Sequence, residues 1–185
     1  SIQIQDYTTL EIPQQVHSES GDNLTKMIDP YSYRKNLTMP KMIFIGTIDE
    51  YWPVDAIKNY LDSIPGQNFI QYVPNAGHGL GDKKQAFQAL SSFFAYTITK
   101  QSYPECEWEL VENASKIHLN AIATPELLVD AVVWSAQSED RDFRDEEWTS
   151  QSLNVKNIKE IKTDVNYPKS GYKAFYMDLK YTDPN

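Results

Sequence analysis

The spacing of hydrophobic residues changes partway along this chain of 185 residues. Before about residue 103, hydrophobic positions form short continuous runs or recur at helical spacing, and after residue 105 they alternate with polar positions. Continuous short runs are typical of strands buried in a parallel sheet, whereas alternation is typical of antiparallel strands with one buried face. The pattern therefore predicts a polar leading segment over residues 1–36, an α/β unit over 37–103 and an antiparallel, β-sandwich-like accessory domain over 104–185. The leading segment is interpreted as part of a cap or insertion.

The α/β unit begins with a short hydrophobic strand at Met42–Ile45, and a second strand follows at Phe69–Val73. Between them, Pro53 suits the first turn of a helix, and hydrophobic residues recur at helical spacing over 54–61. Two strands joined by one helix predict a right-handed crossover, which leaves the loops after both strands at the same edge of a parallel sheet. A long amphipathic helix over 83–100 is expected to cover one face of this sheet.

The two loops carry the residues with the clearest catalytic chemistry. Asp49 follows the first strand and His78 follows the second. Catalytic groups gather at the carboxyl ends of strands in open α/β sheets, so these two side chains are expected to meet. A carboxylate that accepts the proton of one imidazole nitrogen leaves the other nitrogen free to act as a base toward a nucleophile. We predict that Asp49 and His78 form a catalytic acid–base pair, and that Tyr51 and Trp52 either line a substrate-binding cleft or pack beneath the loop.

The alternating segment begins at Cys106, which is the only cysteine of the chain and so cannot form an intrachain disulfide. It shares an alternating run with Trp108 and Leu110, and this pattern predicts a buried thiol that behaves as a small hydrophobe. Further strands are expected over 116–121, 127–134, 150–161 and 173–181. His118 lies on the polar face of its strand with no second ligand at metal-binding spacing, so no metal site and no cofactor are predicted.

Charge and composition exclude several classes of partner. The net charge is −9 and the sequence pI is about 4.8. The chain has no basic cluster, so it offers no electrostatic footprint for nucleic acid or for anionic lipid. No hydrophobic run approaches the roughly 18 residues of a transmembrane helix. We therefore expect no nucleic-acid partner and no transmembrane segment.

One acidic segment, residues 138–148, has two interpretations. Its carboxylates alternate along a loop and are a conceivable calcium site, but no glycine occupies the sharp-turn position of an EF-hand. Local pairs between arginine and carboxylate side chains, anchored by a buried Trp148, explain the same residues. We favour this structural interpretation.

Several longer motifs resemble a known family. The motif Gly46-Thr47-Ile48-Asp49 followed by Trp52-Pro53, and then Ala76-Gly77-His78, is similar to the last βαβ unit of the α/β-hydrolase fold. Together with four further strings, it resembles the PhoPQ-activated pathogenicity-related protein family over roughly residues 24–150. These strings are Asp29-Pro30-Tyr31, Leu37-Thr38-Met39-Pro40-Lys41, Val73-Pro74-Asn75, and Asp142-Phe143-Arg144 with Trp148.

The resemblance implies a fold and a function. It implies that the chain is the carboxyl-terminal part of an α/β-hydrolase fold, with a parallel sheet and crossover helices, followed by a small antiparallel β domain. By the resemblance, Asp49 is the acid and His78 the base of a Ser-Asp-His triad. The substrate is then a small ester or peptide, and the location is secreted or periplasmic.

The nucleophile of such a triad has no counterpart here. None of the seven glycines stands two residues before a serine in a Gly-x-Ser-x-Gly elbow. We therefore expect the nucleophile on a missing amino-terminal portion of the same protein, the chain being a proteolytic product, an engineered segment or one chain of a processed pair. The alternative is a secreted, non-enzymatic virulence or signalling protein on a hydrolase scaffold.

Overall fold

The computed structural model describes residues 2–182. The chain forms two compact units, residues 1–81 and residues 82–185. The sequence predicted domain boundaries after residues 36 and 103, and these stay predictions. The boundary between the two compact units lies after residue 81.

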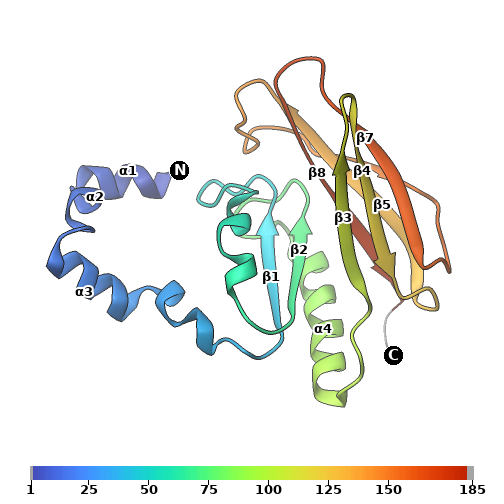
Figure 1. Ribbon diagram of the computed structural model, residues 1–185, viewed down its shortest axis with the longest axis horizontal. Coiled ribbons are helices and arrows are strands. Elements are labelled where there is room, and N and C mark those ends of the chain that lie inside the picture. Colours follow the sequence, from blue (N-terminus) through green and yellow to red (C-terminus); the bar gives the residue numbers. More distant parts are fainter. Residues whose placement is uncertain (1, 183–185) are drawn as a thin grey trace. The chain divides into compact units, whose positions relative to one another are not determined.

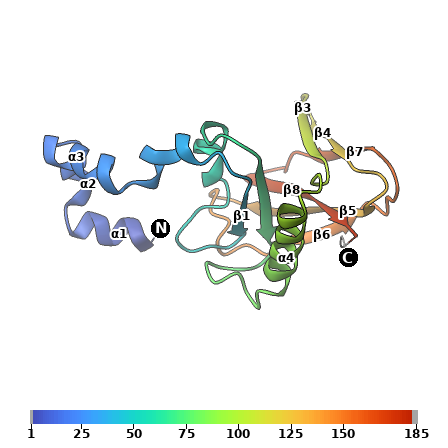
Figure 2. The ribbon, with the colours of Figure 1, turned by 90° about the horizontal axis from the view of Figure 1, so that it is seen from below.

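The first unit starts with a run of helices rather than a sheet. They are α1 (Ile2–Thr9), α2 (Ile12–Gln15), α3 (Glu19–Ile28) and the 3-10 helix η1 (Pro30–Asn36). Figure 2 shows these helices following one another ahead of β1. The Ser18 side chain caps α3 by accepting the Gly21 N–H at 3.1 Å. Within 5–36 no residue is buried, so the helices do not contribute to a core of their own.

Two parallel strands follow, β1 (Lys41–Gly46) and β2 (Asn68–Val73). Their register pairs Lys41 with Asn68 at one end and Gly46 with Val73 at the other. Both strands run in the same direction in Figure 1, so their carboxyl ends lie at the same edge. This is the arrangement that the hydrophobic runs predicted for the two strands.

The expected fold class is nevertheless wrong. In the described residues the parallel sheet has two strands, and the expected crossover helix is replaced by two short 3-10 turns, η2 (Ala56–Asn59) and η3 (Leu61–Ser63). The rest of the described sheet structure is antiparallel. A parallel sheet with crossover helices, as in an α/β-hydrolase fold, is therefore not what this chain forms.

The physical reason for the missing helix lies in its polar residues. The helical spacing over 54–61 spans too few residues to stabilise a helix without strong packing. Asn59 donates to the Ala56 carbonyl at 3.1 Å, and Ser63 donates to the Tyr60 carbonyl at 2.7 Å. Such local side-chain bonds compete with the helical hydrogen-bond pattern and favour turns.

The second unit begins with the helix α4 (Lys84–Thr99), which confirms the helix expected over 83–100. Ala86 and Tyr96 are buried, whereas Phe87, Phe94 and Ile98 are exposed. The hydrophobic stripe of α4 is thus only partly covered.

The remainder of this unit is antiparallel. Its strands form two three-stranded sheets, of order β3-β4-β7 and β6-β5-β8. They are β3 (Cys106–Glu112), β4 (Lys116–Ala123), β5 (Leu128–Ser138), β6 (Thr149–Ser152), β7 (Glu160–Asn166) and β8 (Tyr172–Tyr181). All of the strands expected from the alternating pattern have a counterpart.

The core of this unit lies between its two sheets. Ala121 and Ala123 of β4 and Ile161 of β7 contact Leu128 and Ala131 of β5 in one buried cluster. Partly buried hydrophobic side chains of β8 and of the loop after β6 pack against it. Small alanine side chains on one sheet leave room for the larger side chains of the other, so the sheets interdigitate. Cys106 does not belong to this core: it is exposed, which corrects the expectation of a buried thiol.

The acidic segment between β5 and β6 has the expected structural role. Arg144 Nε donates to both carboxylate oxygens of Asp142, at 2.8 and 3.0 Å. The Trp148 side chain is 2% exposed, and its ring packs against Phe143 and Tyr176. In the described part of the chain, no group of three or more His, Cys, Asp or Glu side chains is arranged to hold a metal ion.

The ion pair of this segment makes a pH-dependent contribution to stability. Hydrogen bonds from Arg144 lower the pKa of Asp142 to about 2. A folded pKa below the unfolded value of about 3.9 stabilises the native state above that pH, and the contribution is lost as the pH falls toward about 2. In a carboxyl-detected NMR titration, Arg144→Gln is expected to raise the pKa of Asp142 toward its ordinary value. Lys159→Gln, which removes a cation beside Ala123 and away from this segment, is expected to leave it unchanged, and an equal response to both variants would contradict the assignment.

Candidate active site

Asp49 lies in the turn directly after β1 and is held by backbone hydrogen bonds. Its Oδ1 accepts the N–H groups of Tyr51 at 2.8 Å and of Trp52 at 3.1 Å. The residue is buried, at 6% exposure. Two hydrogen bonds to one oxygen orient the carboxylate and leave Oδ2 for another partner.

That partner is His78, in the turn after β2. His78 Nδ1 lies 3.0 Å from Asp49 Oδ2, and 55% of the His78 side chain is exposed. The ring of Tyr51 meets the imidazole edge-on, with centroids 5.0 Å apart. An ionised carboxylate only accepts hydrogen bonds, so Nδ1 carries the proton in this contact. In residues 2–182 no hydrogen bond engages Nε2, which is the nitrogen that would accept a proton from a nucleophile.

The two turns are joined by a short set of backbone contacts. The Ile48 N–H donates to the Ala76 carbonyl at 3.1 Å, and the Asn75 N–H donates to Thr47 Oγ1 at 2.8 Å. Glu50 Oε2 accepts the backbone N–H of His78 at 3.2 Å. These bonds hold the aspartate turn against the histidine turn, and the distance between Asp49 and His78 follows from them.

Gly46 makes this approach possible. A Cβ atom at Gly46 would lie 2.3 Å from the Ala76 carbonyl oxygen and 2.5 Å from that of Gly77. Both neighbours are backbone atoms, which cannot rotate away. The end of β1 therefore requires glycine because the histidine turn crosses it closely.

The variant Gly46→Ala is expected to push the two turns apart. We expect a loss of about 1–3 kcal/mol in the stability of the first unit, measured by amide hydrogen exchange in β1 and β2, and loss of the downfield Nδ1–H proton signal of His78. Gly79→Ala is the matched control, because a Cβ at Gly79 meets nothing within 4 Å. An intact Nδ1–H signal in Gly46→Ala would show that the contact does not depend on this close approach.

Sequence reasoning placed Asp49 and His78 on matching loops, and the structure brings their side chains together. Tyr51 contacts the imidazole, whereas Trp52 is 53% exposed and contacts Asp49 through its backbone N–H. The catalytic and substrate-binding roles of these four residues stay predictions. Sequence reasoning missed Glu50, because only the tertiary contact between the turns reveals its bond to His78.

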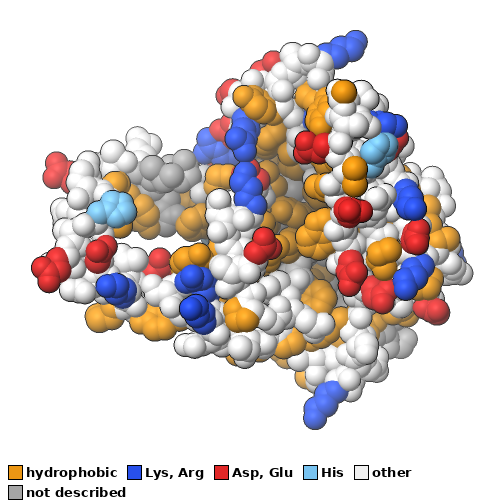
Figure 3. All heavy atoms as spheres, viewed as in Figure 1, with side chains coloured by type: hydrophobic (Ala, Val, Ile, Leu, Met, Phe, Trp, Pro, Cys, Tyr) orange, Lys and Arg blue, Asp and Glu red, His pale blue; other side chains and the backbone are white. Residues whose placement is uncertain are grey.

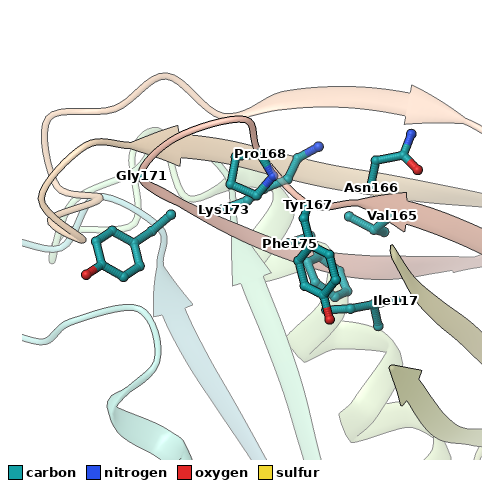
Figure 4. A pocket seen from close by; sticks show the side chains of 9 residues that line it. Ile117, Val165, Asn166, Tyr167, Pro168, Gly171, Lys173 and Phe175 are labelled. Carbon is teal, nitrogen blue, oxygen red and sulfur yellow. The ribbon is translucent and has the colours of Figure 1, made fainter. Parts of the chain in front are cut away.

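The second unit has a surface groove, which does not include Asp49 or His78 of the first unit. It has a volume of about 230 Å³ and is lined mainly by hydrophobic side chains, among them Ile117, Val165 and Phe175, with Lys173 at its side (Figure 4). Its titratable side chains are Tyr167, Tyr172 and Lys173, and its lining includes no carboxylate, histidine or cysteine.

Comparison with known proteins identifies the family. The model of the family described as "PhoPQ-activated pathogenicity-related protein" matches residues 1–144. The chain belongs to this family. The resemblance of the motifs to this family is thereby confirmed, and the match starts earlier along the chain than the motifs do.

One curated relative of this PhoPQ-related chain is "Autocrine proliferation repressor protein A" of Dictyostelium discoideum. The two are 24% identical over 204 residues, which cover 98% of this chain and 41% of the relative. The chain thus spans about two fifths of the length of that protein. No solved structure matches the chain. Among the described residues, no helix has both the length and the hydrophobicity needed to cross a membrane.

Proposed function

We propose that this PhoPQ-related chain supplies the acid and the base of a serine hydrolase that acts on small esters or peptides. The observation that carries the proposal is the 3.0 Å contact between Asp49 Oδ2 and His78 Nδ1. A buried carboxylate orients an imidazole whose side chain is 55% exposed, and within residues 2–182 no hydrogen bond engages Nε2. Ser-His-Asp hydrolases use this arrangement to take the proton from the serine hydroxyl.

The proposal assigns a role to each neighbouring residue. Asp49 holds the imidazole in the tautomer with the proton on Nδ1 and stabilises the imidazolium that forms when Nε2 accepts a proton. Glu50 positions the histidine turn through the backbone N–H of His78. Tyr51 and Trp52, beside the pair, are proposed to contact the substrate.

The nucleophile must then come from outside this chain. The chain contains no Gly-x-Ser-x-Gly elbow. We propose that a further, amino-terminal portion of the same protein carries the serine and the oxyanion hole. One observation supports this: the relative is longer than the chain.

The test is a hydrolysis assay with p-nitrophenyl acetate and a fluorophosphonate probe for active-site serines. We expect no turnover and no labelling for the 185-residue chain alone. A longer protein that contains this chain is expected to turn over the ester and to label at one serine, and His78→Ala is expected to abolish both. Unchanged labelling and turnover in His78→Ala would refute the proposal.

A second candidate function is favoured by the relative. Because one relative is named as an autocrine proliferation repressor, we propose as the alternative a secreted, non-enzymatic signalling role for this family member. In that case biological activity is expected to survive His78→Ala, whereas substitutions around Arg144 and Trp148 are expected to abolish it. A proliferation assay with the two sets of variants separates the candidates.

A further inference from the structure

Strand β3 lies at the open edge of its sheet and is unusually exposed. All seven of its residues are exposed, including Trp108 at 59% and Leu110 at 49%. Both of these side chains share a face with Ala121 and Leu119 of the neighbouring β4, which are buried. Trp108 and Leu110 therefore extend the core face of the sheet onto its edge strand, β3. A long, hydrophobic edge of this kind is a template for pairing with another strand.

The backbone of β3 has the matching hydrogen-bond pattern. The hairpin to β4 is closed by the Asn113 N–H, which donates to the Lys116 carbonyl at 3.0 Å. In an antiparallel pair, the backbone N–H and C=O groups of every second residue point toward the neighbouring strand. Counted back from Asn113, the backbone groups of Glu109 and Glu107 therefore also point toward β4. The N–H and C=O groups of Trp108 and Leu110 then point to the open side. In residues 2–182 no strand pairs with β3 on that side.

The outer face of the same strand is acidic. Glu107 and Glu109 lie on the face opposite Trp108, and no ion pair engages either of them within the described residues. Figure 3 shows acidic and hydrophobic side chains beside one another over β3 and β4. Pairing of β3 with the β3 of a second copy would bring these glutamates close together, and like charges on facing strands are destabilising. Charge complementarity instead favours a basic partner.

We propose that the edge of β3 binds an extended segment with alternating basic and hydrophobic residues, which adds as a fourth strand of the sheet. The hydrophobic side chains of the segment pack on Trp108 and Leu110, and its basic side chains face Glu107 and Glu109. Backbone hydrogen bonds to the open edge supply affinity, and the alternating side chains supply specificity. This inference is independent of Asp49 and His78.

The probe is the synthetic peptide acetyl-Lys-Val-Lys-Val-Lys-Val-Lys-amide, whose seven residues match the length of β3. It is titrated into the 185-residue chain and followed by NMR and amide hydrogen exchange. We expect the amides of Trp108 and Leu110 to exchange rapidly in the free protein and to become protected by the peptide. The amides of Glu107 and Glu109, which already pair with β4, are expected to change little.

Three controls separate strand addition from simple charge attraction. A peptide of the same composition in blocks, Lys-Lys-Lys-Lys-Val-Val-Val, has no alternation and is expected to give no protection. The double variant Glu107→Lys/Glu109→Lys is expected to weaken binding by about tenfold or more. Asp145→Lys/Glu147→Lys changes the net charge equally in the segment between β5 and β6, which belong to the other sheet, and is expected to leave binding nearly unchanged.

A backbone control uses the open-edge N–H of Leu110. Leu110→Pro removes that N–H without removing a bond to β4, a position at which edge strands tolerate proline. Leu110→Ala removes only the side chain, so binding that is weaker in the proline variant than in the alanine variant reports the backbone bond. The proposal is overturned if the alternating peptide does not bind, if it binds without protecting Trp108 and Leu110, or if these amides are already protected in the free chain.

Discussion

Replacement of Asp49 by asparagine is expected to lower kcat/KM for ester hydrolysis by roughly 10³- to 10⁴-fold in a longer protein that supplies the nucleophile. Asparagine is nearly isosteric with aspartate, so the bonds from Tyr51 and Trp52 to Oδ1 are preserved. The amide cannot stabilise an imidazolium, and its NH₂ group at the second position would favour the tautomer of His78 with the proton on Nε2. That tautomer cannot accept the proton of a serine hydroxyl.

The matched control for this effect is Asp62→Asn. Asp62 is exposed in the turn before β2, so the same chemical change there is expected to alter kcat/KM by less than about twofold. The loss in Asp49→Asn is expected in kcat, with KM little changed, because the imidazolium forms in the transition state. Full activity of Asp49→Asn would show that the pair of Asp49 and His78 is structural, and it would favour the non-enzymatic candidate.

The second large effect is expected in the core between the two antiparallel sheets. Leu128 is fully buried at 0% exposure, and it contacts the alanines of β4 together with Ile161. Leu128→Ala is expected to lower the free energy of unfolding of this unit by about 2–5 kcal/mol, because the surrounding alanines are too small to fill the cavity. Chemical denaturation followed by tryptophan fluorescence measures this loss, since three of the four tryptophans lie in residues 82–185.

The neighbouring residue provides the control. Val129 follows Leu128 at an irregularity in the pairing of β5 with β8 and is 39% exposed. Val129→Ala is therefore expected to change the free energy of unfolding by less than about 1 kcal/mol. Similar losses in both variants would mean that the strand itself, and not the cluster around Leu128, limits stability.

The antiparallel part of the molecule was the more predictable. Alternation at period two was enough to locate β3, β4 and β8, because a strand with one buried face repeats every second residue. The strand β5 was located from the more continuous hydrophobic run over 127–134. The alternation did not show that the hydrophobic side chains of the edge strand β3 would be exposed. Cys106, Trp108 and Leu110 have the pattern of core residues, yet they are exposed because no described strand extends the sheet beyond β3.

In the parallel part of the molecule, the two strands were predicted correctly but the segment that connects them was not. The runs at Met42–Ile45 and Phe69–Val73 correctly indicated paired strands, whereas the segment over 54–61 was assigned to a helix that does not form. Its helical spacing was real, but Asn59 and Ser63 bond locally to carbonyl groups and stabilise turns instead. Short segments are decided by such local competition and by packing, which a periodicity does not measure.

For the candidate site, the sequence by itself determined which residues have the chemistry and on which loops they lie. An aspartate after one strand and a histidine after the next are readable from the order of the elements. Only the tertiary structure decided that the carboxylate is buried, that Glu50 bonds the histidine turn and that Gly46 admits a close backbone crossing. Those features depend on contacts between residues about 30 positions apart, and such contacts form only when β1 and β2 pair in one particular register.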